Sequence, residues 1–168
     1  MYHIVTPYPK FIMVVDDEID IITVIKHLLQ VKTNNNNNFF HVHGFTNPFL
    51  ALEHFKLNYK DYVLVIADIK MQSINGFEFI KRLREIHAAV KVLLMSALNI
   101  DNDLFDSFQV LASSIMVDGF MQKPISMRNL NEIVQKTILG LKTIKERSSA
   151  AAALSSSQMR ESQLKQQQ

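Results

Sequence analysis

Carboxylates follow two apolar runs of this sequence, and an ammonium group follows a third. Asp16 and Asp17 come directly after the run FIMVV, Asp68 follows YVLVIA, and Lys123 follows the short run GFMQ. If these runs are neighbouring parallel strands, their carboxyl ends share one sheet edge, where three carboxylates and one ammonium gather. Like charges held so close favour a bound cation, and a cation held by few carboxylates indicates phosphate chemistry.

The elements that would position these residues alternate along the chain. Apolar runs indicate strands, and segments with helical apolar spacing separate them. The expected strands cover residues 11–15, 39–45, 62–67, 90–95 and 119–122. The expected helices cover residues 19–31, 48–57, 76–87, 103–112 and 127–141. This alternation predicts a parallel sheet with helices on both faces.

The chemistry of the strands predicts their order. The runs 11–15, 62–67 and 90–95 are almost continuously apolar, which is typical of strands buried on both faces. The run that carries His41 and His43, two residues we expect to be solvated, and the short run before Lys123 suit the edges. We therefore predict an α/β fold, a doubly wound five-stranded parallel sheet of order 2-1-3-4-5, with ligands bound near the switch between the first and third strands.

Local signals predict where helices begin. Asn47, directly before Pro48, and Ser126 are good N-cap residues for the second and last helices. Asp17, with Asp20 three residues later, could cap the first helix. The asparagine run 34–38 favours neither helix nor strand, so we interpret it as a loop insertion.

Taken singly, each polar residue at the predicted edge has a plain structural explanation. An aspartate after a strand commonly caps a helix or lies in a solvated turn. Ser96 could be a strand-end hydroxyl, and Lys123 a surface lysine held extended by Pro124. Their joint occurrence, each at the end of a different strand, is what predicts a shared site.

In order and in context, these residues resemble the receiver domain of two-component response regulators, over about residues 11–145. The matching positions are Asp16-Asp17, Asp68 within DIKM, Asn75-Gly76-Phe77-Glu78, Ser96-Ala97, Phe120 and Lys123-Pro124. The resemblance implies a flavodoxin-like fold. It also implies that Asp68 is the phosphoacceptor, a nucleophile that takes a phosphoryl group from a phosphohistidine of a sensor histidine kinase or a phosphotransfer protein.

The same resemblance implies the remaining roles at the site. Mg²⁺ would be the cofactor, held by carboxylates of Asp17 and Asp68, by the backbone carbonyl of Lys70, and by Asp16 mainly through a water. The implied phosphate-binding groups are Lys123, the Ser96 hydroxyl and the Ala97 amide; Lys123 and Ser96 are catalytic with Asp68. Ser96 and Phe120 would form the switch that alters the face of the fourth helix, fifth strand and fifth helix, where a downstream protein partner binds.

We therefore expect a receiver without a separate output domain, which catalyses only its own phosphorylation and dephosphorylation. One alternative is a receiver-like docking module that works without phosphorylation, although such a module has no need of the intact site. A second is a Mg²⁺ phosphohydrolase with an aspartyl-phosphate intermediate. In such enzymes an acid–base carboxylate typically lies two residues beyond the nucleophile, where this chain has Lys70.

Three departures from the family pattern are visible. Gln72 stands where the family usually has a proline, which removes a rigid turn beside the nucleophile. The side chain of Lys70 is expected to lie beside the acyl phosphate, where it could change the rate of autodephosphorylation. The segment between Ser96 and Lys123 is somewhat longer than is common, so the fourth helix and its partner are the least determined features.

Composition narrows the classes of function. The 168 residues carry a net charge of +2 without long charge runs, which gives no case for binding nucleic acid or an anionic membrane. The absence of cysteine excludes disulfides and thiolate chemistry. No apolar stretch is long enough for a signal peptide or a membrane span, so we expect a cytoplasmic protein. The sequence offers no helix-turn-helix candidate, so we expect no DNA-binding domain. We expect a short extension over residues 1–10, the receiver domain over 11–146 and a disordered low-complexity tail over 147–168.

Overall fold

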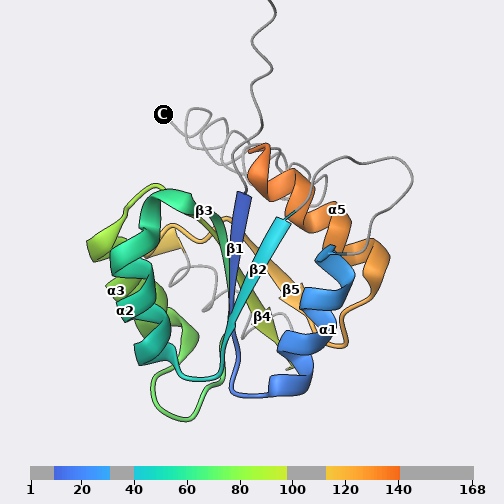
Figure 1. Ribbon diagram of the computed structural model, residues 1–168, viewed down its shortest axis with the longest axis horizontal. Coiled ribbons are helices and arrows are strands. Elements are labelled where there is room, and N and C mark those ends of the chain that lie inside the picture. Colours follow the sequence, from blue (N-terminus) through green and yellow to red (C-terminus); the bar gives the residue numbers. More distant parts are fainter. Residues whose placement is uncertain (1–9, 31–39, 98–112, 141–168) are drawn as a thin grey trace, which may run out of the picture.

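The computed structural model describes residues 10–30, 40–97 and 113–140, which form a doubly wound α/β fold (Figure 1). The five parallel strands of its sheet have the order β2-β1-β3-β4-β5, which confirms the predicted order. The strands are β1 (Lys10–Val15), β2 (Phe40–Phe45), β3 (Tyr62–Asp68), β4 (Lys91–Ser96) and β5 (Gly119–Gln122). The predicted edge strands, β2 and β5, are the edges of the sheet.

Helices cover both faces of the sheet. They are α1 (Ile19–Gln30), α2 (Pro48–Asn58), α3 (Gly76–Ile86) and α5 (Met127–Ile138), with a short 3₁₀ turn η1 (Tyr59–Asp61) before β3. In Figure 1, α2 and α3 lie on one face of the sheet, and α1 and α5 lie on the other. The predicted fourth helix, the asparagine run and the predicted tail lie outside the described residues.

Two of the three predicted helix caps are confirmed. Asn47 Oδ1 accepts hydrogen bonds from the amides of Phe49 and Leu50, and Ser126 Oγ accepts one from the amide of Asn129. The prediction for Asp17 is wrong. The first helix begins after Glu18, and the Asp17 carboxylate accepts its hydrogen bond from the amide of Gln72 instead.

The last helix is shorter than the sequence predicts. It ends at Ile138 rather than near residue 141, and Leu139 is its C-cap. Gly140 follows with a φ of 68°, the left-handed conformation that commonly ends a helix and that glycine adopts without strain.

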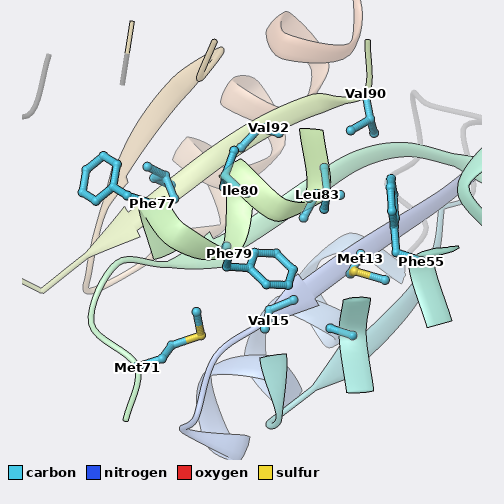
Figure 2. Packing of buried hydrophobic residues seen from close by; sticks show 14 of the residues in the cluster. Met13, Val15, Phe55, Met71, Phe77, Phe79, Ile80, Leu83, Val90 and Val92 are labelled. Carbon is cyan, nitrogen blue, oxygen red and sulfur yellow. The ribbon is translucent and has the colours of Figure 1, made fainter. Parts of the chain in front are cut away.

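The sheet separates two apolar cores because successive residues of a strand point to opposite faces. Met13 and Val15 of β1 pack with Phe55 of α2 and Phe79 of α3 on one side (Figure 2). Ile12 and Val14 of the same strand pack on the other side, where the cluster also includes Ile25, Leu64 and Val134. Every residue from Ile12 to Val15 is fully buried, as the continuous apolar pattern predicts.

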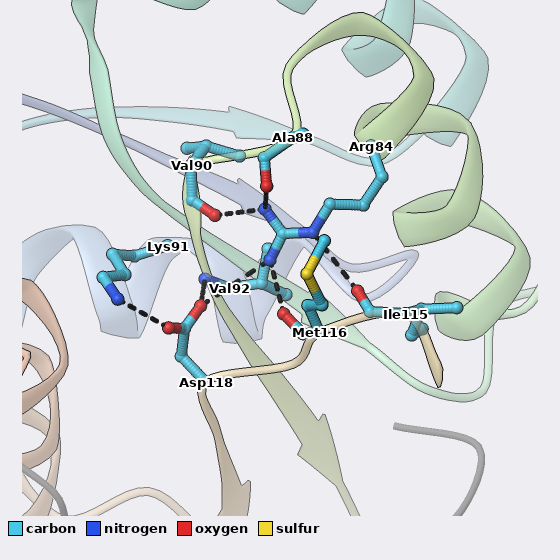
Figure 3. A network of polar contacts seen from close by, with 8 residues as sticks. All are labelled: Arg84, Ala88, Val90, Lys91, Val92, Ile115, Met116 and Asp118. Carbon is cyan, nitrogen blue, oxygen red and sulfur yellow. Dashed lines mark hydrogen bonds and ion pairs between the residues drawn. The ribbon is translucent and has the colours of Figure 1, made fainter. Parts of the chain in front are cut away.

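A polar clamp fixes the segment that leads into β5 (Figure 3). The guanidinium of Arg84 on α3 donates hydrogen bonds to four backbone carbonyls, those of Ala88, Val90, Ile115 and Met116. Two of these acceptors precede β4, and two precede β5. One side chain therefore links α3 to the segments before β4 and before β5. Its donors satisfy backbone carbonyls that would otherwise need another hydrogen-bond partner at the edge of the core.

Asp118 extends this clamp to β4. Its Oδ1 lies 2.8 Å from Nζ of Lys91, and its Oδ2 accepts a hydrogen bond of 2.9 Å from the amide of Val92. Oδ2 also lies 3.7 Å from Nη2 of Arg84. The carboxylate thus sets the start of β5 beside β4, and so sets the register of the strand that leads to Lys123.

The expectation that both strand histidines are solvated is wrong for one of them. His41 is exposed, but His43 is half-buried and its Nδ1 lies 2.7 Å from the hydroxyl of Tyr62. The same hydroxyl lies 3.1 Å from Nδ1 of His54 on α2. A pocket of about 100 Å³ is lined by this cluster and by Phe11 among others.

Candidate functional site

The polar residues of the site lie where the parallel strands end. Asp16 follows β1, Asp68 is the last residue of β3, Ser96 is the last residue of β4, and Lys123 follows β5. Backbone hydrogen bonds continue the sheet past the strand ends. The amide of Asp16 donates to the carbonyl of Phe45, and the amide of Lys123 donates to the carbonyl of Ser96. The sheet itself therefore fixes where these side chains begin.

Three carboxylates converge at this edge. Asp16, Asp17 and Asp68 each offer an oxygen, and these oxygens all lie within 4.8 Å of one another. Asp16 has no exposed surface, Asp68 is 4% exposed, and Asp17 is half-buried. The sequence prediction that these residues meet is confirmed in the geometry.

Each carboxylate is oriented by one backbone amide nearby. Asp16 Oδ1 accepts from Glu18 at 3.0 Å, and Asp68 Oδ2 accepts from Lys70 at 2.9 Å. Both of these bonds are local, two residues apart in the chain. The third, from the amide of Gln72 to Asp17 Oδ2 at 3.2 Å, joins loops 55 residues apart.

The ammonium of Lys123 lies among the acidic groups. Its Nζ is 2.8 Å from Asp16 Oδ2, 3.0 Å from Asp68 Oδ1 and 3.3 Å from Glu18 Oε1. The Lys123 side chain is only 8% exposed, so these contacts are poorly screened by water. The three aspartates and this one ammonium sum to a formal charge of −2, which Glu18 lowers to −3.

Burial and pairing act in opposite directions on these groups. Burial raises the pKa of Asp16, although the hydrogen bonds from Lys123 and from the Glu18 amide oppose this effect. Burial alone would lower the pKa of Lys123, but its hydrogen bonds with Asp16 and Asp68 outweigh burial and raise that pKa above the ordinary lysine value. Lys123 therefore remains positively charged at neutral pH.

The donor set fits a small hard divalent cation. Its side-chain ligands are all oxygens, the type that Mg²⁺ and Ca²⁺ prefer. Asp16 Oδ2 is buried, and within the described residues the partner that compensates its charge is the Lys123 ammonium, 2.8 Å away. A cation at this edge would neutralise charge that one lysine leaves unbalanced.

The other predicted residues surround this cluster. Ser96 is buried at the end of β4, Ala97 beside it is exposed, and Lys70 is exposed in the loop after β3. Phe120 is half-buried on β5, where it is paired in register with Leu94 and packs against the core on the α2 and α3 side. Leu94 and Ser96 are two residues apart on β4, so their side chains point to the same face of the sheet. Because Phe120 is paired with Leu94, it lies on that face too, one strand away from Ser96.

Two contacts of the site were not foreseen from the sequence. Glu18 supplies a carboxylate to Lys123, and no pattern marked it. Gly76, at the start of α3, packs so close that an added Cβ would lie 2.4 Å from the backbone oxygen of Asp68. Its position within Asn75-Gly76 at a helix start was a visible signal, but the close approach became clear only in three dimensions.

Comparison with known proteins decides the family. The family profile of the response regulator receiver domain matches residues 12–135, most of the chain. The chain belongs to the response regulator receiver family. The resemblance seen in the sequence, to a receiver domain of two-component systems, is therefore confirmed. The fold and the converging carboxylates agree with it.

Two curated response regulators illustrate the relationship of this receiver to longer proteins. The CpxR homolog of Haemophilus influenzae, a transcriptional regulatory protein, is 30% identical over 119 residues, which cover 71% of this chain and 46% of that protein. SaeR of Staphylococcus epidermidis is 23% identical over 121 residues, with the same two coverages. The chain thus spans about half the length of the curated relatives it matches.

Solved structures share the receiver fold. The response regulator TrrA of Thermotoga maritima, solved in complex with Mg²⁺ and BeF, is 27% identical with a TM-score of 0.61, covering 76% of this chain and 98% of that one. The chemotaxis protein CheY4 of Vibrio cholerae is 20% identical with a TM-score of 0.64 and coverages of 77% and 98%. Among the residues that the structure describes here, no helix has the length and apolar character to cross a membrane.

Proposed function

We propose that this receiver accepts a phosphoryl group on Asp68 from a phosphohistidine, carried by a histidine kinase or a phosphotransfer protein, and that it changes partner binding as a result. The observation that carries this proposal is the position of Asp68 Oδ1. This oxygen lies 3.0 Å from the Lys123 ammonium, at the edge where the oxygens of Asp16 and Asp17 converge. Family membership supports the same reaction class.

The reaction needs little besides positioning and charge. An oxygen of Asp68 attacks phosphorus, the phosphorus–nitrogen bond of the phosphohistidine breaks, and the electron pair of that bond stays on the imidazole. Asp68 Oδ2 is oriented by the Lys70 amide, and its carboxylate is almost completely buried. A fixed and desolvated carboxylate loses little freedom when the phosphoryl group arrives, which lowers the entropic part of the barrier.

The acidic edge would hold Mg²⁺ through Asp16, Asp17, Asp68 and the backbone carbonyl of Lys70. When bound, the cation neutralises the charge of these carboxylates together with that of the incoming phosphate. TrrA, 27% identical, was solved with Mg²⁺ and BeF, which supports this cofactor for the present chain.

Lys123, Ser96 and Ala97 would bind the transferred phosphoryl oxygens. Lys123 stays charged because of its hydrogen bonds with Asp16 and Asp68, so it supplies a permanent cation beside the accepting oxygen. Ser96 is the last residue of the neighbouring strand β4, and Ala97, an exposed residue, follows it. The Ser96 hydroxyl and the Ala97 amide would there meet an oxygen bound to Asp68.

Switching would start from the same contacts. Ser96 moves toward the phosphoryl group, and Phe120, on the same sheet face one strand away, turns into the vacated space. This exchange would repack the face that includes β5 and α5, where we place the downstream partner. A local charge event would thus choose between two packed arrangements.

An acyl-phosphate donor tests the proposal. The protein is incubated with acetyl phosphate and Mg²⁺, and its intact mass is followed with time. We expect one added phosphoryl group that hydroxylamine removes, and none in Asp68→Asn. No modification of the wild type would favour a docking module that works without phosphorylation, and continued turnover of the donor without accumulation would favour a phosphohydrolase.

A further inference from the structure

Asp17 differs from the other two carboxylates of the cluster in what holds it. Asp16 and Asp68 are both buried, and both pair with the Lys123 ammonium. Asp17 is half-buried, and the described contacts of Lys123 do not include it. Its orientation therefore depends on a weaker partner than a buried ion pair.

That partner is a backbone amide on another loop. The Gln72 N–H donates to Asp17 Oδ2 over 3.2 Å, from the loop after β3 to the loop after β1. The bond exists only because residue 72 is not proline, which has no N–H to donate. The side chain of Gln72 is exposed and is not needed for the bond.

We propose that the Gln72 amide is a positioning group for the divalent cation, because it holds the Asp17 carboxylate in the cluster before the cation arrives. The inference rests on the proposed function, since it assumes that Asp17 is a Mg²⁺ ligand. A hydrogen bond to Oδ2 leaves Oδ1 of Asp17 free to bind the metal. Without the amide, a half-exposed carboxylate would turn toward water, away from two like charges.

The expected effect follows from what outer partners of metal ligands contribute. Loss of such a partner typically weakens metal binding by tenfold to a hundredfold. Because Gln72 is exposed and its hydrogen bond is long, we expect the lower end of that range, about tenfold. If the Gln72 amide instead competed with the cation for Asp17, its loss would tighten Mg²⁺ binding.

Two substitutions at one position separate the amide from the side chain. Gln72→Pro removes the N–H donor, and Gln72→Ala keeps it. The dissociation constant of Mg²⁺ is measured by calorimetry or by NMR titration for the wild type and both variants. We expect Gln72→Ala to bind as the wild type does and Gln72→Pro to bind about tenfold more weakly. Equal or tighter binding by Gln72→Pro would overturn the proposal.

Amide hydrogen exchange gives a readout that does not depend on the proline variant folding. In the wild type without Mg²⁺, the Gln72 amide should exchange more slowly than an unprotected amide, and Asp17→Ala should abolish that protection. Unprotected exchange in the wild type, or protection unchanged in Asp17→Ala, would contradict the proposal. Failure of the proposed function is distinct, because the wild type would then bind no Mg²⁺ at this cluster or would take no phosphoryl group from acetyl phosphate, whatever the two substitutions at position 72 do.

Discussion

Nζ of Lys123 lies 2.8 Å from Oδ2 of Asp16, a residue that has no exposed surface. The pair links the ends of β1 and β5, strands that do not touch in the sheet. It therefore holds the outer strand of the sheet to its centre through charge. The same ammonium reaches Asp68, so the residue that stabilises the acidic edge is also placed to meet a phosphoryl group there.

Removal of this ammonium should destabilise the fold. Lys123→Met would leave buried carboxylates without their counter-charge, and loss of one partner of a buried pair typically costs about 3 kcal/mol or more. Urea unfolding in the absence of Mg²⁺ measures the effect. The control is Lys136→Met, which breaks an exposed ion pair with Glu132 on α5 and should change stability by less than about 1 kcal/mol.

Added Mg²⁺ should restore part of the stability of Lys123→Met, because a cation at the acidic edge replaces the missing charge. A variant as stable as the Lys136→Met control, with or without Mg²⁺, would show that Lys123 does not compensate the cluster.

The close approach of α3 to the end of β3 leaves little room for a side chain at position 76. In Gly76→Ala the new Cβ would lie 2.4 Å from the backbone oxygen of Asp68, so the helix start or the Asp68 backbone must shift. We expect a loss of about 2 kcal/mol in the free energy of unfolding and slower phosphorylation by acetyl phosphate.

Gly140 provides the comparison. It has a φ of 68°, and an added Cβ would have no neighbour within 4 Å, so Gly140→Ala should cost about 1 kcal/mol through backbone strain while phosphorylation stays at the wild-type rate. Equal phosphorylation rates in the two variants would show that the Gly76 contact does not position Asp68.

The Arg84 clamp should require a guanidinium and not merely a positive charge. Arg84→Lys keeps the charge but cannot donate to four carbonyls in a fixed fork, so several backbone acceptors lose their partner. We expect a loss of about 2 kcal/mol in the free energy of unfolding, measured by urea titration. Arg82→Lys on the same helix, where Arg82 forms an exposed pair with Glu78, should be nearly neutral.

Stability should fall with acid because His43 is held neutral. Burial lowers its pKa below the usual 6.5, and the charges of His54, His41 and Lys26 add to this effect. Between the folded pKa and 6.5 the unfolded chain binds more protons, so stability is fully present above 6.5 and is lost as the pH falls through that window.

Urea midpoints between pH 7.5 and pH 5 measure this slope. The Tyr62 hydroxyl can donate to only one of the two histidines that it contacts, so an added proton on the accepting ring breaks a hydrogen bond. His43→Gln should flatten the slope, and His27→Gln should leave it unchanged, because His27 is exposed and is not among the charges that lower the pKa of His43. An unchanged slope in His43→Gln would contradict this assignment.

Strand order and the converging aspartates were predictable because each depends on residue type along a single segment. Continuous apolar runs marked the strands buried on both faces, and Asp16 and Asp68 followed two of them directly. The helix start at Asp17 was predicted wrongly, because its carboxylate bonds to the Gln72 amide from a distant loop. Such a partner leaves no signature near Asp17 in the sequence.

Contacts to the backbone were the main features that the sequence did not reveal. Arg84 binds carbonyls, and a carbonyl looks the same whichever residue carries it. His43 was expected in water because its partner, the Tyr62 hydroxyl, comes 19 residues later on another strand. The departure from proline at Gln72 was visible in the sequence, but the group that receives its amide was not.

The central claim is that Asp68 itself carries the phosphoryl group. The most direct measurement is borohydride trapping after incubation with acetyl phosphate and Mg²⁺, since borohydride reduces an aspartyl phosphate to homoserine, followed by peptide sequencing in the mass spectrometer. We predict homoserine at position 68 and aspartate unchanged at positions 16 and 17. Homoserine at either of those positions, or none at position 68, would contradict the account.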